Sequence, residues 1–209
     1  MNIKTLLAGA AFAALSLTAA ASNATVVYSN FTATPEFDTQ APAVVDTFSA
    51  GAGAGTATIV LDGYASLDGQ NPYEDDFTLK VNGVTTLVGT FNLGGGGDNV
   101  VYSAPAGTVA TNLSGYNGGQ VSFTGGQEQL VIPVALVEGL NKFSLTYSSL
   151  PAPAHAGFQG LGDEGWGVHS VQVTGLAVPE PATWAMMLMG FGGLGAVLRS
   201  ARRKQFASA

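Results

Sequence analysis

The 209-residue sequence contains no cysteine. Disulfide bonds, thiolate catalysis and tetrahedral zinc sites with sulfur ligands are therefore excluded. Charged residues make up only 10% of the chain, against roughly 25% in an ordinary soluble domain. Glycine is frequent instead, at 29 residues, and threonine, valine and serine are common. This composition predicts one all-β extracellular domain, rich in turns, with an extension at each end.

Positive charge is scarce and unevenly placed. Between residues 22 and 178 the only cations are Lys80 and Lys142, against thirteen acidic residues. The other cations lie near the ends, at Lys4, Arg199, Arg202, Arg203 and Lys204. A surface this acidic repels phosphate backbones, so nucleic acid is not expected as a partner. The same surface attracts divalent cations.

The first residues predict an export signal. Lys4 gives a positive start, an apolar segment follows over residues 6–17, and small residues then permit cleavage after Ala21 or Ala24. This is the layout of a secretory signal peptide over residues 1–21. A buried alanine-rich helix is the alternative, but the order of charges and the β-like remainder of the chain favour export.

The C-terminal segment predicts a membrane anchor. Residues 182–198 contain no charge, and as a helix they would span about 26 Å, the short limit for crossing a bilayer. The cations that follow would stay in the cytoplasm as a basic end over 199–209 and leave the main domain outside. The alternative is a buried C-terminal helix, which the basic cluster and the preceding prolines disfavour.

This segment also resembles a known sorting signal. The stretch PEPATWA, the glycine-rich apolar span and the arginine-rich end together resemble a PEP-CTERM sorting tail, in its PEPxxWA variant, over residues 178–204. The motif residues are Pro179, Glu180, Pro181 and Trp184, and the membrane-stop cluster is Arg199, Arg202, Arg203 and Lys204.

The resemblance implies a route through the cell envelope. Such proteins are exported by Gram-negative bacteria that make exopolysaccharide, are held in the inner membrane by the tail, and are released by a membrane-embedded exosortase that recognises the Pro-Glu-Pro triplet. The physical chemistry agrees, because two prolines keep the triplet extended and outside the helix, where a protease can bind it.

The region 25–176 predicts a β-sandwich ectodomain. Its clearest unit is a hairpin with Asn82-Gly83 in the turn, the strongest short hairpin signal. The pairs expected across this hairpin are Val81 with Val84, Leu79 with Thr86, and Phe77 with Val88.

Short strands separated by turns are expected through the rest of this region. The expected strands are residues 25–31, 56–61, 99–103, 120–123, 129–136, 142–147 and 166–173. The glycine runs at 51–55 and 94–97 are expected to be loops. The spacing of these strands predicts an all-β, two-sheet, jelly-roll-like sandwich.

The last expected strand carries a second resemblance. The stretch DEGWGVHSVQV is similar to the closing strand of PEP-CTERM ectodomains and of jelly-roll carbohydrate-binding modules, which often reads Asp-Glu-x-Trp-x-Val-Asp-Asn-Val. This chain has His169 and Ser170 where Asp-Asn stands in that pattern. The difference weakens any transfer of a metal ligand on this strand.

Acidic residues gather in two stretches of the ectodomain and are the candidate metal ligands. Carboxylate oxygens on glycine-containing loops suit Ca²⁺, which would stiffen loops in a chain that lacks disulfides. A solvated acidic loop is the alternative. The candidate Ca²⁺ ligands are Asp62, Asp68, Asp75, Asp76, Asp163 and Glu164.

No catalytic residue is predicted. The sequence lacks a G-x-S-x-G motif and offers only His155 and His169 as bases for serine hydrolysis. His169 is expected to be half-buried beside a bulge in the last strand, and Trp166 to be a core residue. The predicted function is therefore a non-enzymatic, exported surface protein that associates with exopolysaccharide. The alternatives are an anchored glycan hydrolase and a structural surface protein without a ligand.

Overall fold

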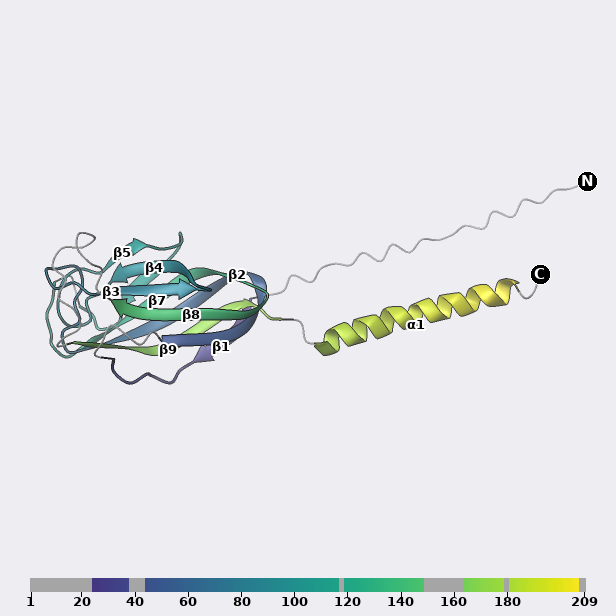
Figure 1. The fold of residues 1–209 in the computed structure, drawn as a ribbon, viewed down its shortest axis with the longest axis horizontal. Coiled ribbons are helices and arrows are strands. Elements are labelled where there is room, and N and C mark those ends of the chain that lie inside the picture. The colour runs from purple at the N-terminus through teal and green to yellow at the C-terminus, as the bar shows by residue number, and fades with distance from the viewer. Residues whose placement is uncertain (1–23, 38–43, 117–118, 149–163, 179–180, 207–209) are drawn as a thin grey trace, which may run out of the picture.

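The computed structural model describes residues 24–37, 44–116, 119–148, 164–178 and 181–206, so the predicted signal peptide lies outside the described residues. Nine strands form two packed sheets, and one helix extends away from them (Figure 1). The two-sheet all-β fold predicted from the sequence is confirmed. The strands are β1 (Thr25–Asn30), β2 (Val44–Tyr64), β3 (Asp76–Val81), β4 (Val84–Thr90), β5 (Val100–Ser103), β6 (Val109–Asn112), β7 (Gly126–Leu136), β8 (Gly139–Ser148) and β9 (Gly165–Leu176).

The long strand β2 belongs to both sheets. Its first part, up to Ala50, pairs with β8 in the sheet β2-β8-β3-β4-β5. From Gly53 onward it pairs with β7, and from Thr56 continuously with β9, in the sheet β1-β9-β2-β7-β6. The glycine run at 51–55 is therefore the crossing point between the sheets, and its prediction as a loop is wrong.

Close packing explains why this crossing point needs glycine. A Cβ on Gly55 would lie 2.6 Å from the carbonyl oxygen of Thr174 and 2.7 Å from Leu136 Cδ1. A side chain there would push β2 away from both of its partners, so the absence of side chains lets one strand run between β7 and β9.

The hairpin of β3 and β4 has the predicted turn but a different register. Asn82 and Gly83 both have positive φ, 52° and 83°, as the two central residues of a type I′ turn require. Val81 faces Val84 as predicted, but a register shift then places Leu79 opposite Leu87 and Phe77 opposite Gly89. The two outer predicted pairs are wrong because this bulge moves Leu87 from the outer face into the core.

Most other predicted strands are present with longer bounds. The alternation of β8 is confirmed, since Phe143, Leu145 and Tyr147 are all fully buried. Two differences remain: residues 120–123 form no strand, and β6, which the sequence analysis missed, pairs with β7. The core between the sheets is closed by Trp166, which is fully buried and in ring contact with Tyr147 at 5.4 Å.

Helix α1 (Pro181–Phe206) lies clear of the sandwich (Figure 1). Its large apolar side chains are 40–71% exposed on several sides, at Met186, Met187, Leu188, Met189, Phe191 and Leu194. A helix at the predicted position is confirmed. Among the residues that the structure describes, however, no helix combines enough length and apolarity to cross a membrane, so the predicted transmembrane span is not supported.

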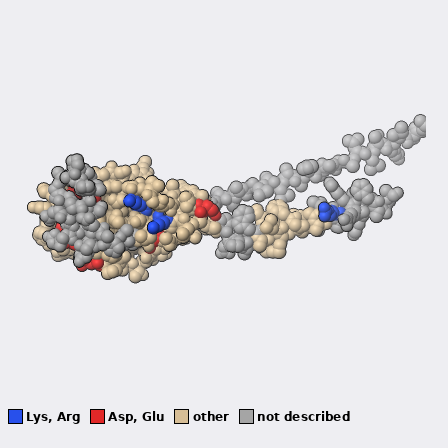
Figure 2. Space-filling view, in the orientation of Figure 1, with Lys and Arg blue, Asp and Glu red and all other residues tan. Residues whose placement is uncertain are grey.

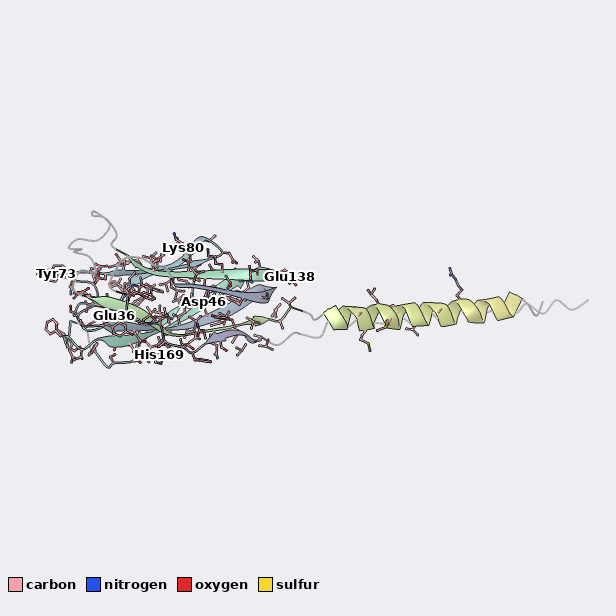
Figure 3. The ribbon with its side chains drawn as sticks, turned by 60° about the horizontal axis from the view of Figure 1, so that its bottom comes forward. Glu36, Asp46, Tyr73, Lys80, Glu138 and His169 are labelled. Carbon is pink, nitrogen blue, oxygen red and sulfur yellow. The ribbon has the colours of Figure 1, made fainter. Side chains whose placement is uncertain are left out.

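The sandwich has two unlike ends. The loop end, farthest from α1, carries Tyr73 (Figure 3) and is built by residues 65–75, 92–99, 113–116 and 119–125. The tail end carries Glu138 (Figure 3) and the turn between β3 and β4 (Figure 1). Charged side chains are few on the face shown in Figure 2. Most of the acidic residues named below are buried at the loop end.

Candidate functional site

The connection between β2 and β3 at the loop end holds three buried acidic residues, and two of them, Asp68 and Asp75, contact each other. Asp68 and Asp75 are 4% and 1% exposed. Thr90, on β4, fixes both by donating its hydroxyl to the carbonyl oxygen of Asp75 at 2.7 Å and to that of Asp68 at 3.2 Å. The backbone N–H of Asp68 in turn donates to Asp75 Oδ2 at 3.3 Å. The connection is thus folded back on itself, and these two carboxylates point into the protein.

A third carboxylate arrives from the far end of the sequence. Glu164 immediately precedes β9 and is 4% exposed. The fully buried Trp166, two residues later, anchors the start of this strand in the core. The hydroxyl of Ser66 donates to Glu164 Oε1 at 3.2 Å, which ties β9 to the β2–β3 connection.

Asp68, Asp75 and Glu164 converge on one point, and we call them the carboxylate cluster. Each offers an oxygen that lies within 4.8 Å of the oxygens of the other two. Burial raises the pKa of Glu164 strongly, and hydrogen bonding and charge from Asp75 and Asp68 raise it further. Oxygens this close require either a shared proton or a cation between them.

Gly95 packs directly against this cluster. A Cβ at residue 95 would lie 1.9 Å from the carbonyl oxygen of Ser66 and 2.6 Å from Asp68 Oδ1. The glycine run at 94–97, predicted as a loop, therefore lets the backbone lie against the carboxylates, and it connects β4 to β5 as expected.

Asp76 is buried next to the cluster without belonging to it. This predicted metal ligand is 1% exposed, and burial together with the charges of Glu74 and Asp75 raises its pKa to about 7. Glu74 accepts a short hydrogen bond from the hydroxyl of Tyr102. Asp76 is not among the three carboxylates whose oxygens converge.

Asp62, another predicted metal ligand, lies apart from the carboxylate cluster. Asp62 follows the buried Leu61 on β2, and the alternation of the strand turns it to the outer face. There it faces His169 Nδ1 at 3.3 Å and accepts from Gln127 Nε2 at 2.7 Å. A register shift of β9 at His169 confirms the predicted bulge, and the side chain of His169 is exposed, at 51%.

Several predicted residues fall outside the described residues or on the helix. Asp163, His155, Pro179 and Glu180 are not described. Pro181 is the first residue of α1, and Trp184 also lies on this helix. The membrane-stop residues Arg199, Arg202, Arg203 and Lys204 lie on its last turns.

A polar hollow of about 480 Å³ adjoins the carboxylate cluster at the loop end. It is lined by Gln70, Asn71, Pro72, Tyr73, Gly95, Gly96, Gly97, Asp98, Gly119 and Val121. Tyr73 is 53% exposed, and Asn71 Nδ2 donates a short hydrogen bond to Asp68 Oδ1. The wall of the hollow and the cluster are therefore directly connected.

A larger groove of about 710 Å³ lies toward the tail end. Its lining is mostly apolar and comes from β2, β7 and the β3–β4 hairpin, including Val81, Val84, Pro133, Val134 and Val137. It contains no convergent set of ionisable side chains.

Some residues that organise the loop end were not found from the sequence. Thr90 and Gly95 act through the backbone and through close packing, and neither has a motif of its own. Tyr147 was expected only as an inward-facing strand residue. Its contact with Trp166 could not be predicted from the sequence, because it depends on β8 and β9 lying in opposite sheets.

Comparisons with known proteins identify the tail. Residues 177–204 match the PEP-CTERM protein-sorting motif, which confirms the predicted sorting tail and implies an exported, membrane-anchored protein. Among solved structures, the CBM35 from Cellvibrio japonicus Abf62 is similar with 19% identity and a TM-score of 0.37, over 68% of this chain and 71% of that chain. No curated protein matches the sequence.

Proposed function

We propose that this chain is a non-enzymatic surface protein that is exported, anchored at the inner membrane by its tail, processed by an exosortase and then associated with exopolysaccharide. The observation that carries the proposal is the PEP-CTERM motif at 177–204, which begins directly after the last residue of β9. The sandwich is the part that processing would release outward.

The exposed apolar side chains of helix α1 support a role for the tail in contact with the membrane. Its large apolar side chains are 40–71% exposed among the residues that the structure describes, and Arg199 is exposed near its end. An apolar surface of this kind marks a site of interaction with lipid or protein. Contact with the membrane would cover it until an exosortase cleaves near Pro179, Glu180 and Pro181.

The loop-end hollow is the candidate site for polysaccharide. The exposed ring of Tyr73 can stack on a sugar ring, while Asn71 and Asp98 offer hydrogen bonds to hydroxyl groups. The hollow lies at the end of the sandwich opposite α1 (Figure 3), so an anchored molecule would hold it away from the membrane.

Burial of the acidic residues favours a binding protein over the alternative of a glycan hydrolase. Glycosidases place two carboxyl groups about 5–10 Å apart with the sugar between them. The oxygens of the carboxylate cluster lie within 4.8 Å of one another, and the three residues are at most 4% exposed. A sugar could not enter between them.

Sorting is tested in a host that contains an exosortase. We expect the full chain to be released into the medium, and the variant Glu180→Ala to remain in the membrane fraction at its unprocessed mass. Thr183→Ala, which changes a variable position of the same motif, serves as the control and should be released normally. Equal release of wild type and Glu180→Ala would refute processing through this motif.

Polysaccharide association is tested by retention of the detergent-solubilised full chain on immobilised exopolysaccharides. We expect Tyr73→Ala to weaken retention about tenfold, because loss of one aromatic stacking contact is worth about 1–1.5 kcal/mol. Phe31→Ala removes an aromatic ring that is 66% exposed outside the hollow and should have no effect. The structural alternative without a ligand predicts no retention of any variant.

A further inference from the structure

The carboxylate cluster could bind a metal ion, and neither sorting nor polysaccharide association explains why its three carboxylates converge. It joins the β2–β3 connection to the start of β9 in a chain without cysteine. We propose that Asp68, Asp75 and Glu164 bind one Ca²⁺ ion. The ion would be the cross-link between two segments that are about one hundred residues apart in the sequence.

The distances within the cluster fit a single Ca²⁺. Oxygens bound to one such ion at 2.3–2.6 Å are at most about 5 Å apart. Asp68, Asp75 and Glu164 meet this limit, since their oxygens lie within 4.8 Å of one another. All the side-chain ligands are carboxylates, with no nitrogen or sulfur, which favours Ca²⁺ over zinc or copper.

Two buried oxygens around the start of β9 lack hydrogen-bond partners among the described residues. One is Glu164 Oε2, and the other is the hydroxyl of Tyr147, whose side chain is fully buried. The ring of Tyr147 lies 5.4 Å from that of Trp166, two residues after Glu164.

Unpartnered buried oxygens are rare in folded proteins and call for an explanation. An ionised carboxylate is only an acceptor, so Asp68 and Asp75 in their charged form cannot donate to Glu164 Oε2. A cation at the cluster would satisfy this oxygen. This observation is independent of the spacing of the three carboxylates.

The surrounding contacts hold the ligands in place before an ion arrives. Thr90 fixes the carbonyl groups of Asp68 and Asp75, and Ser66 fixes Glu164 Oε1. Gly95 closes the side of Asp68 without adding a side chain. Binding therefore requires little reorganisation, which favours affinity.

A proton shared by the three carboxyl groups is the competing explanation, and it predicts different behaviour. Glu164→Gln keeps the size and shape of the side chain and removes its charge, as a proton would. This variant should fold as stably as the ion-free wild type. It should lose the response to Ca²⁺, because an amide cannot replace the charged ligand.

The test uses the full chain in detergent, freed of metal with EDTA and titrated with CaCl₂ by calorimetry and thermal denaturation. We expect one ion to bind, the melting temperature to rise by several degrees, and MgCl₂ to act far more weakly. Glu164→Gln should weaken Ca²⁺ binding by more than about tenfold, and Asp62→Asn on the outer face should leave it unchanged.

Terbium luminescence gives a second readout that does not depend on stability. Tb³⁺ bound at the cluster should be sensitised by Trp166, and Ca²⁺ should displace it. No binding of Ca²⁺ to the folded wild type up to about 10 mM, well above the weak limit of about 1 mM for extracellular sites, would overturn the proposal. Equal binding by wild type and Glu164→Gln would also overturn it. These results are independent of polysaccharide retention, because Ca²⁺ is the only ligand added.

Discussion

The two ends of the sandwich solve the problem of buried polar groups in opposite ways. At the tail end, Asn141 is fully buried at the start of β8 and makes four hydrogen bonds, to Asn82, Gly139 and both backbone groups of Val137. At the loop end, buried carboxylates face one another and Glu164 Oε2 has no donor among the described residues.

The tail end therefore satisfies its buried polar groups with hydrogen bonds inside the protein, whereas the loop end should respond to protons and cations in the solution. A buried amide with all its hydrogen bonds made stabilises one turn arrangement at any ordinary pH. Buried carboxyl groups that converge on one point depend on a proton or a cation between them, so the loop end should be the part of the sandwich that changes with solution conditions.

Backbone packing at the two ends should give the largest contrast. Gly95→Ala would force a Cβ to within 1.9 Å of the Ser66 carbonyl oxygen, whereas a Cβ on Gly83 would meet nothing within 4 Å. We expect Gly95→Ala to lower the free energy of unfolding by more than about 4 kcal/mol. Gly83→Ala should cost about 1–2 kcal/mol, from its positive φ alone. Denaturant unfolding followed by tryptophan fluorescence measures both, and equal losses would contradict the contrast.

Removal of the buried amide should have the next largest effect. Asn141→Ala leaves the backbone groups of Val137 and the carbonyl oxygen of Gly139 without their partner, which should cost about 3 kcal/mol. The loss should be the same at pH 5 and pH 8 and with or without CaCl₂. A loss that disappears on adding CaCl₂ would show that the two ends are coupled.

A pH dependence should arise from the loop-end half of the molecule. Glu128, on β7, is fully buried, and burial raises its pKa to about 7 against the opposing hydrogen bonds from Asn99 and Asn112. Between about pH 4.5 and 7 the folded state binds more protons than the unfolded state, so stability falls as pH rises through this window.

The variant Glu128→Gln isolates that contribution. Without CaCl₂, it should reduce the loss of stability between pH 5 and pH 8 by about 2 kcal/mol. Melting temperatures across this range provide the measurement, and Glu138→Gln at the exposed tail-end turn is the control. An unchanged pH profile in Glu128→Gln would show that Glu128 does not titrate as described.

The smallest effect is expected on the outer face. His169→Ala removes a partly exposed ion pair with Asp62, and such pairs contribute roughly 0–1 kcal/mol. We expect a change of about 0.5 kcal/mol or less at pH 6, screened further by salt. A loss above about 2 kcal/mol would mean that Asp62 and His169 form a structural site rather than a surface contact.

Local patterns predicted the parts of this protein that depend on neighbouring residues. The Asn82-Gly83 turn, the alternation of β8 and the sorting tail are each written in a few consecutive residues. Contacts between distant segments were predicted poorly. The turn rule predicted Thr86 opposite Leu79, but a bulge places Leu87 there. The glycine run at 51–55 was predicted as a loop, but it lies within strand β2.

The sequence by itself determined that this is an exported all-β protein with a PEP-CTERM-type tail. Strand periodicity, turn residues and the order of PEP motif, apolar span and basic cluster are all local signals. The sequence also determined that acidic residues would be available for a cation. Only the tertiary structure decided which of them meet. The bend of β2 through both sheets and the arrival of β9 bring Glu164 to Asp68 and Asp75 and turn Asp62 away, because strand pairing over long sequence separations fixes which face each side chain occupies.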